Sequence, residues 1–310
     1  MTERPLKVLI SNDDGPPSRE ESPFILPFIE HLEGLGWDVK VCLPNAQKSW
    51  ISKSFMIKDH IDVSYYHRDT GEISYHRRNP SDFVLLNSTP ATCVNIALNY
   101  IFKDEQFDLV LGGPNFGRNT STVYTLSSGT IGAALEAVMC KQKSIALSFA
   151  IFERNFGKKE IQGSIEMAVD IIRQLYKVNQ WPEDGLFNVN IPLSAEKRPV
   201  YLTTFNKMHY GNLFKPLPAD KIRSADPSKP ASTEEPAEQA VRKTAEGQES
   251  GRLVFHFAPD FTGIVFPTNA PEGTDAWAMN LRYCSVTPMV ASYEMAKTNV
   301  DYGFKVINKL

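Results

Sequence analysis

The sequence predicts an α/β fold in which a parallel sheet is covered by helices on both faces. Short apolar runs typical of buried strands alternate with segments of helical periodicity over about the first 190 residues. Parallel strands need helical crossovers of this kind, and the helices bury both faces of the sheet. The chain has 310 residues, of which 42% are apolar and 22% charged, so it can bury a sizeable core.

The strands and helices expected in this part of the chain follow one another in regular order. Turn residues end two of the strands, since Pro44 follows the second and Gly112-Gly113-Pro114 follows the fourth. The expected strands are residues 6–11, 37–43, 83–86, 107–111, 144–150 and 187–191. The expected helices are residues 23–35, 89–102, 130–140 and 161–178.

The chain is expected to divide into two parts near residue 195. Residues 1–195 form the core, with a hairpin near residues 61–78 that projects from the sheet edge around the turn Asp69-Thr70-Gly71. Residues 196–310 form a smaller β-rich extension and a C-terminal helix. Within the extension, residues 215–251 are rich in Pro, Ser, Glu, Lys and Ala, a composition that favours a disordered insertion.

Composition and charge exclude several classes of protein. The net charge is -3, so the chain lacks the basic excess of proteins that bind duplex nucleic acid or anionic membranes. No run approaches the roughly 18 apolar residues of a membrane span, and the N-terminus does not resemble a signal peptide, so we expect a cytoplasmic protein. None of the four cysteines forms a C-x-x-C pair, which favours buried free thiols.

Polar side chains follow several of the expected strands. Asp13 and Asp14 come after the first strand, Ser49 after the second, and Asn115 and Asn119 after the fourth. Because ligands bind beyond the carboxyl ends of parallel strands, these side chains are expected to converge. Oxygen ligands suit Mg²⁺, Mn²⁺ or Ca²⁺ rather than zinc. On spacing alone, an ordinary polar turn remains the more frequent meaning of such an Asp-rich segment.

A second constellation, Ser128-Gly129-Thr130, opens the helix expected at residues 130–140. Backbone amides at a helix N-terminus bind phosphate, and the two hydroxyls add donors. The alternative is an ordinary helix cap. A P-loop is excluded because no Gly-Lys-Ser/Thr follows, and a dinucleotide-binding protein is disfavoured because no G-x-G-x-x-G follows the first strand.

Catalysis by a serine–histidine pair is not supported by the sequence. A G-x-S-x-G nucleophile turn is missing, and no histidine lies at a spacing typical of a metal site. The histidines at positions 31, 60, 67, 76 and 209 are expected on the surface or in the hairpin.

The motifs together resemble the SurE family of survival-protein phosphatases. The resemblance spans nearly the whole chain outside residues 215–251. It is carried by strand–Asn-Asp-Asp-Gly at residues 8–15, Pro-x-x-x-x-Ser at 44–49, Ser-Thr-Pro-x-x-Cys-Val at 88–94, Gly-Gly-Pro-Asn at 112–115, Gly-x-Asn at 117–119, Ser-Gly-Thr-x-Gly-Ala-Ala at 128–134, and Gly-Thr-Asp at 273–275 before Tyr-Cys-Ser-Val-Thr-Pro at 283–288.

This resemblance implies a Rossmann-like fold and a metal-dependent phosphomonoesterase acting on nucleoside 5′- or 3′-monophosphates. It implies metal ligands at Asp13, Asp14, Ser49 and Asn115. In such a site we expect one of the two aspartates to orient the attacking water or to accept its proton. It implies phosphate contacts at Asn119, Ser128, Gly129 and Thr130. It further implies a homodimer with exchanged C-terminal parts and a small phosphorylated substrate, usually a nucleotide.

Some positions depart from the bacterial pattern of the family. Trp50 stands where a glycine is usual, Ser121 and Thr122 stand where acidic residues are usual, and Gly112 replaces a serine. Pro16-Pro17 and Ser49-Trp50 resemble a fungal branch described as acid phosphatases, in which some members are fused to a tubulin-tyrosine-ligase-like domain. The alternative function is a catalytically weak, dimeric binding or scaffold domain.

Overall fold

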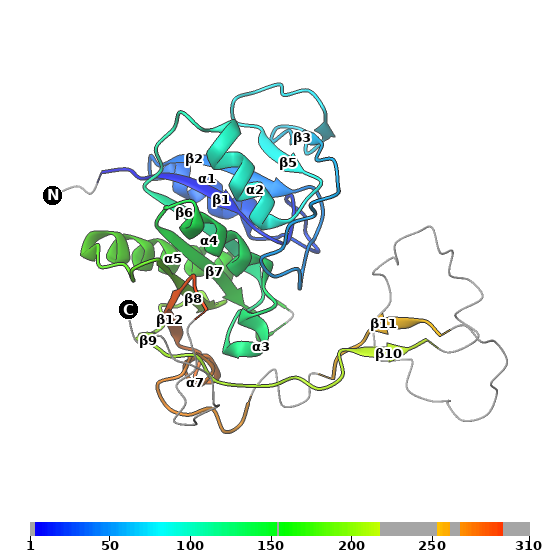
Figure 1. Cartoon of the computed structure of the whole chain (residues 1–310). Helices are drawn as coiled ribbons and strands as arrows, with labels where there is room; N and C mark the ends of the chain where they lie inside the picture. Colours follow the sequence, from blue (N-terminus) through cyan, green and yellow to red (C-terminus); the bar gives the residue numbers. More distant parts are fainter. Residues whose placement is uncertain (1–3, 154, 218–252, 261–266, 294–310) are drawn as a thin grey trace, which may run out of the picture.

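The computed structural model describes residues 4–153, 155–217, 253–260 and 267–293. These residues form one ten-stranded sheet in the order β4-β3-β5-β2-β1-β6-β7-β8-β12-β9, together with a separate two-stranded sheet, β10-β11 (Figure 1). The centre of the main sheet, from β5 to β8, is parallel throughout. The expected α/β fold is therefore confirmed, with antiparallel strands added at both ends.

The parallel strands are close to those expected from the sequence. They are β1 (Lys7–Ser11), β2 (Asp38–Pro44), β5 (Phe83–Leu86), β6 (Leu109–Phe116), β7 (Ser144–Ala150) and β8 (Gly185–Pro192). The remaining strands are β3 (Val63–Tyr66), β4 (Ile73–Ser74), β9 (Val200–Leu202), β12 (Cys284–Val290), β10 (Phe214–Pro216) and β11 (Phe255–Phe257).

Helices cover both faces of the main sheet. The helices of the described residues are α1 (Ile25–Gly34), α2 (Pro90–Ile96) with its π-helical continuation η1 (Ala97–Ile101), α3 (Ser121–Thr125), α4 (Gly129–Met139), α5 (Lys158–Val178) and α7 (Asp275–Asn280). Helices α1 and α5 share one apolar cluster with the sheet, and α2 and α4 share the cluster on the opposite face. In the described residues, no helix is both long and apolar enough to cross a membrane.

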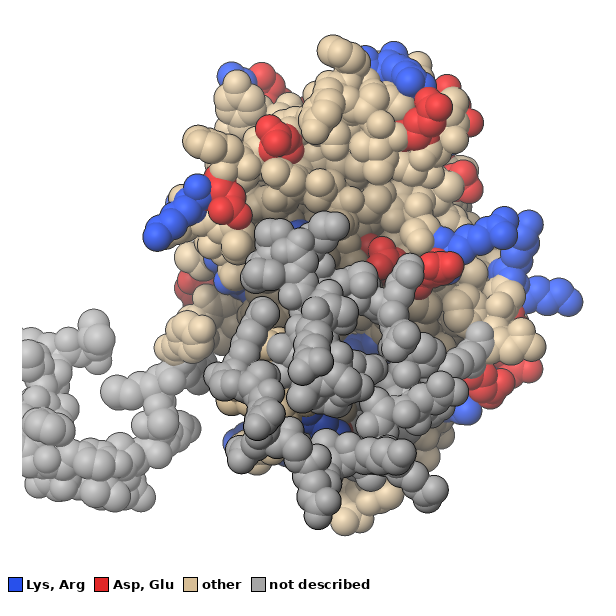
Figure 2. Space-filling view, turned by 90° about the vertical axis from the view of Figure 1, so that its right-hand side faces the viewer, with Lys and Arg blue, Asp and Glu red and all other residues tan. Residues whose placement is uncertain are grey.

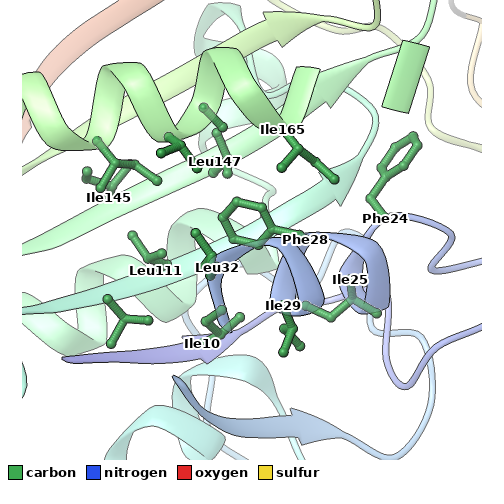
Figure 3. Close-up of a cluster of buried hydrophobic side chains, with 14 of the residues drawn as sticks. Ile10, Phe24, Ile25, Phe28, Ile29, Leu32, Leu111, Ile145, Leu147 and Ile165 are labelled. Carbon is green, nitrogen blue, oxygen red and sulfur yellow. The ribbon is translucent and has the colours of Figure 1, made fainter. Parts of the chain in front are cut away.

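The core between α1, α5 and the sheet is built from large apolar side chains (Figure 3). Phe28 and Leu32 of α1 are completely buried, as are Ile10 of β1 and Ile165 of α5. Burying a side chain of this size contributes about 1.5–3 kcal/mol, so this layer supplies much of the free energy that holds the strands in register. The carboxyl ends of β1 and β6 are thereby fixed relative to each other.

Strand β6 is longer than the sequence suggested. Gly112-Gly113-Pro114 was expected to end it, but the strand continues to Phe116. The pairing with β7 shifts register between Gly112 and Asn115, as in a β-bulge. A Cβ at Gly113 would lie 2.1 Å from the carbonyl oxygen of Leu147, so only glycine fits. Asn115 therefore belongs to the strand rather than to the loop after it.

The hairpin and the second part of the chain also differ from the expectation in detail. The hairpin does not project from the sheet, because β3 pairs with β5 and extends the edge. Beyond the expected boundary at residue 195, β9 and β12 join the main sheet. Lys215 and Pro216 lie in β10, whereas most of the expected insertion, residues 218–251, and the C-terminal helix lie outside the described residues. All four cysteines are free, and Cys140 alone is not fully buried.

Candidate active site

The candidate site lies at the carboxyl ends of β1 and β6. Strand β1 pairs with β2 on one side and β6 on the other, so the chain order reverses there. Open α/β sheets bind ligands at such a switch point. A cavity of about 260 Å³ occupies this position. It is lined by Asp13, Ser49, Trp50, Asn115, Phe116, Gly117, Arg118, Asn119, Tyr124, Ser127, Ser128 and Ile151.

The turn after β1 is locked by Asn12. Its side-chain oxygen accepts a hydrogen bond from the Gly15 amide (3.0 Å), and its side-chain nitrogen donates to the Gly15 carbonyl (3.0 Å). This local pattern is typical of Asn in turns. The turn leaves Asp13 and Asp14 almost completely buried, with 4% and 3% of their surfaces exposed.

The two aspartates are held by different elements. The Asp13 carboxylate accepts hydrogen bonds from the Gly129 amide (3.1 Å) and the Thr130 hydroxyl at the start of α4. The Asp14 carboxylate accepts a hydrogen bond from the Phe116 amide at the end of β6 (2.6 Å). The aspartate pair is therefore fastened between α4 and β6.

Electrostatics make this pair costly as it stands. Burial raises the pKa of Asp13, although the Thr130 hydroxyl and nearby amides oppose the change. Burial also raises the pKa of Asp14 well above its usual range, and the adjacent charge of Asp13 raises it further. Two buried neighbouring carboxylates call for a cation, because a positive charge stabilises both ionised forms.

Neutral oxygen donors lie beside the carboxylates. The Thr130 hydroxyl that donates to Asp13 also lies 3.3 Å from the side-chain oxygen of Asn115. Ser49 lines the same cavity, and the amide of its neighbour Lys48 donates to the Asp13 carbonyl (2.7 Å). Carboxylate, amide and hydroxyl oxygens form a donor set that fits a hard divalent cation.

In the described part of the chain, no third acidic, histidine or cysteine side chain joins the two aspartates. Across the described ranges, no three His, Cys, Asp or Glu side chains are grouped so that they could hold a metal ion. An ion beside Asp13 would therefore also depend on the neutral oxygen donors.

Asn119 is held by a buried polar network. Its amide donates to the side-chain oxygen of Asn190 (2.7 Å), and its side-chain nitrogen donates to the Ser148 hydroxyl (3.0 Å). Its carbonyl accepts a hydrogen bond from the side chain of Asn188 (2.7 Å). These contacts with β7 and β8 fix Asn119 at the cavity wall, although one of its two side-chain N–H groups is already used.

The start of α4 differs from a simple phosphate cradle. The Ser128 hydroxyl caps the helix by accepting a hydrogen bond from the Ile131 amide (3.1 Å), and Ser128 lines the cavity. Gly129 and Thr130 do not line it; they bind Asp13 instead. A helix N-terminus stabilises negative charge, and here the charge is the protein's own carboxylate.

The structure thus brings most of the expected residues to one place. Asp13, Ser49, Asn115, Asn119 and Ser128 line the cavity, whereas Asp14, Gly129 and Thr130 adjoin it through hydrogen bonds to residues that do.

The sequence did not identify every lining residue as functional. Arg118 and Tyr124 were missed, and Trp50 was noted only as a departure from a family pattern. Arg118 is the middle residue of the Gly-x-Asn element at residues 117–119, and this position could have indicated that it lies beside the site. Trp50 contacts the ring of Tyr124 (6.1 Å between centroids) and that of Phe257 on β11 (5.2 Å), so an aromatic wall borders the cavity.

Asp275 does not line the cavity but holds the segment that forms part of its wall. Its carboxylate accepts hydrogen bonds from the amides of Ser121 (2.7 Å) and Asn206 (2.9 Å). It therefore ties the start of α7 to the segment that carries Arg118 and Asn119. The Gly-Thr-Asp motif contains this residue, but its spacing gave no indication of the contact.

Comparison with known proteins gives a consistent result. The family model "Survival protein SurE" matches residues 8–212. A Saccharomyces cerevisiae protein named "Probable tubulin–tyrosine ligase PBY1" is 30% identical over 93% of this chain. The chain spans only 41% of that yeast protein.

Bacterial relatives are similar over a larger share of their own length. A protein from Petrotoga mobilis named "5′-nucleotidase SurE" is 30% identical over 67% of this chain and 76% of its own. The crystal structure of the SurE protein from Aquifex aeolicus is similar with a TM-score of 0.63 and 26% identity, covering 93% of this chain and 94% of that one. The SurE family model matches residues 8–212, which include most strands of the main sheet. The chain therefore belongs to the SurE family.

Proposed function

We propose that the protein is a metal-dependent phosphomonoesterase that hydrolyses nucleoside 5′- or 3′-monophosphates or related small phosphate esters. The observation that carries this proposal is the buried pair Asp13 and Asp14 beside a cavity that also contains Ser49 and Asn115. The name "5′-nucleotidase SurE" of the Petrotoga relative supports the nucleotide as substrate.

Each candidate residue has a role in this proposal. Asp13, Asp14, Ser49 and Asn115 hold a divalent cation, Mg²⁺ or Mn²⁺. Asn119 and Ser128 contact the phosphate from the cavity wall. Gly129 and Thr130, expected as phosphate contacts, support the site by orienting the Asp13 carboxylate.

The chemistry follows from these roles. A bound cation polarises a phosphoryl oxygen and lowers the pKa of a water molecule. One of the two aspartates orients the attacking water or accepts its proton. Both oxygens of Asp13 already accept hydrogen bonds, so its position is the more firmly fixed. The remaining task of the protein is to place the ester and stabilise the charge on phosphorus.

The decisive experiment is hydrolysis of an aryl phosphate and of nucleoside monophosphates after treatment with EDTA, followed by addition of Mg²⁺ or Mn²⁺. We expect activity to be lost with EDTA and restored by the metal. The variant Asp13→Asn should lose more than about a hundredfold in kcat/KM, because it removes a charged ligand.

Asp170→Asn is a matched control, since this carboxylate is 57% exposed on α5 and pairs only with Lys197 in the described structure. Full metal-dependent activity in Asp13→Asn would show that the metal assignment is wrong. If the wild-type protein releases no phosphate with any metal, the result would favour the alternative function as a binding or scaffold domain.

Assembly stays a prediction from the sequence. The exposed aromatic side chains Phe214, Phe255 and Phe257 on β10 and β11 support a homodimer, which a molar mass in solution would test. The fusion to a tubulin-tyrosine-ligase-like domain is supported by the name and greater length of the yeast relative, and the mass of the native protein would test it.

A further inference from the structure

Arg118 has a fixed place in the cavity wall. It lies between the end of β6 and the start of α3. On one side, the Gly117 amide donates to the carbonyl of Phe149 on β7 (3.1 Å). On the other side, the Asn119 amide donates to Asn190 on β8 (2.7 Å). The backbone that carries the guanidinium is therefore held by two strands of the sheet.

Charge distinguishes Arg118 from its neighbours. Among the described residues that line the cavity, Asp13 and Arg118 are the only charged ones. Burial lowers the pKa of Arg118, and the nearby Asp275 and Tyr124 partly oppose this effect. The Asp275 carboxylate is shared with the amides of Ser121 and Asn206, so it serves several partners. Burial removes part of the hydration of the guanidinium, and an anion that enters the cavity would offset this cost.

Neither the net charge nor the described part of the face in Figure 2 indicates an attractive field for anions. The chain carries a net charge of -3, and the described part of the face in Figure 2 shows basic and acidic side chains interspersed. An anionic ester must therefore be recognised inside the cavity. A guanidinium presents a planar fork of donors that matches two phosphate oxygens, and a lysine cannot reproduce this geometry.

We propose that Arg118 binds the phosphoryl group of the ester, donating hydrogen bonds to its non-bridging oxygens. This inference rests on the proposed phosphomonoesterase function and adds a substrate-binding residue to it. Arg118 and the cation site at Asp13 would then border the same phosphate, because both line a cavity of only about 260 Å³. The positive charge of Arg118 stabilises the charge that builds up on the phosphoryl oxygens during transfer.

The test measures phosphate binding and turnover separately. Inorganic phosphate is titrated into the Mg²⁺-loaded protein by calorimetry, and kcat and KM are measured for a nucleoside monophosphate and for glycerol phosphate. We expect Arg118→Gln to weaken phosphate binding by about tenfold or more, as for a lost charged hydrogen bond. Its kcat/KM should fall by a similar factor for both esters, and Arg118→Lys should recover part of the loss.

Arg198→Gln is the matched control. Arg198 lines a different cavity of about 280 Å³ and donates to the Ser194 hydroxyl (3.1 Å), so its loss should leave phosphate binding unchanged. Thermal melting checks that each variant is folded. If Arg118→Gln does not fold, Arg118→Lys carries the test, because it keeps the charge and removes the planar fork.

Several outcomes would overturn the inference. They are unchanged phosphate binding in the Arg118 variants, a loss confined to the nucleotide, or a wild-type protein that binds no phosphate. The two proposals fail separately. Phosphate binding through Arg118 without turnover would contradict only the proposed function, whereas turnover that does not depend on Arg118 would contradict only this inference.

Discussion

Gly129 is the residue at which α4 comes closest to the aspartate turn. A Cβ at this position would lie 2.7 Å from the Cβ of Asp13 and 2.9 Å from the Cγ2 of Ile51. Neither contact is tolerable, and Asp13 is fixed by its hydrogen bonds to the same turn of helix. Glycine is required here because a carboxylate occupies the space of a side chain.

Gly129→Ala should therefore displace Asp13. We expect a loss of about 1–3 kcal/mol in unfolding free energy, as for an overpacked interior. We also expect the metal-dependent hydrolysis rate to fall by more than about tenfold, because a misplaced ligand disturbs the reacting geometry. Chemical denaturation and phosphatase assays measure the two effects.

Gly34→Ala is the matched control for this substitution. Gly34 is the last residue of α1, and nothing lies within 4 Å of a Cβ built there. It should leave activity unchanged and stability equal or slightly higher. Equal behaviour of the two variants would show that the contact with Asp13 is unimportant.

At the residue scale, the sequence predicted the convergence of the site well. Asp13 and Asn115 follow or end parallel strands, and the geometry of such sheets brings these positions together. The side-chain directions of Trp50 and Arg118 were not predictable, because both lie in irregular segments. Trp50 has a φ of +62°, a left-handed conformation that no spacing rule anticipates for this residue type.

The edge hairpin is fastened by a buried histidine. One ring nitrogen of His67 lies 2.9 Å from the Asp82 carboxylate, and the other lies 2.8 Å from the Ser74 hydroxyl. Asp82 also accepts hydrogen bonds from the amides of Arg78 and Asn79. The Asp82–His67–Ser74 series of hydrogen bonds resembles a serine-hydrolase triad. However, the His67 ring is fully buried, and the three residues connect the end of β3, β4 and the segment before β5. We interpret it as structural.

His67→Ala should loosen the hairpin without affecting the active site. Removing the ring leaves buried polar groups without their partner, so we expect a loss of about 2–4 kcal/mol in unfolding free energy. Hydrolysis per folded molecule should stay the same, because the hairpin lies at the outer edge of the sheet.

Urea denaturation and initial rates test this prediction, with the exposed His60→Ala as the comparison. A large loss of activity in His67→Ala at full stability would contradict the structural interpretation.

At the element scale, long periodic segments were predicted reliably and exceptions had local causes. Helix α5 has a strong apolar stripe, and its expected end at Val178 is confirmed. The continuation of β6 was missed, because Gly113-Pro114 usually ends a strand and the register shift that accommodates it depends on the carbonyl of Leu147 in β7. The hairpin's attachment to β5 was missed because pairing partners are set by the whole sheet.

The N-terminal segment is joined to the rest of the molecule by a cluster around Asp108. This carboxylate accepts hydrogen bonds from the Arg4 guanidinium (2.5 and 2.9 Å), the Lys7 amide (2.9 Å) and the Tyr176 hydroxyl on α5 (2.7 Å). The hydrogen bond from Arg4 is the main reason why the pKa of Asp108 is lowered to about 2. The ionised form is therefore favoured more in the folded than in the unfolded protein.

This difference predicts a dependence of stability on pH. Above pH of about 4, Asp108 is ionised in both states and its stabilisation is complete; it is lost as the pH falls through about 2. We expect a contribution of roughly 1 kcal/mol, because the Arg4 side chain is 63% exposed and the pair is screened by solvent.

Asp108→Asn should remove this part of the pH dependence, which is measured by urea denaturation from pH 2 to pH 6. Asp104→Asn, in the nearby exposed turn, is the control. Identical pH profiles for wild-type protein and Asp108→Asn would disprove the assignment.

On the scale of the whole molecule, the ends of the main sheet have a consequence for behaviour at high concentration. In the part of the chain that the structure describes, the sheet ends at β4, with two residues, and at β9, with three. Long exposed edges provide backbone donors and acceptors on which another chain can add a strand. Edges this short offer few such groups, so a sheet of ten strands is protected from edge-to-edge aggregation by the brevity of its outermost members.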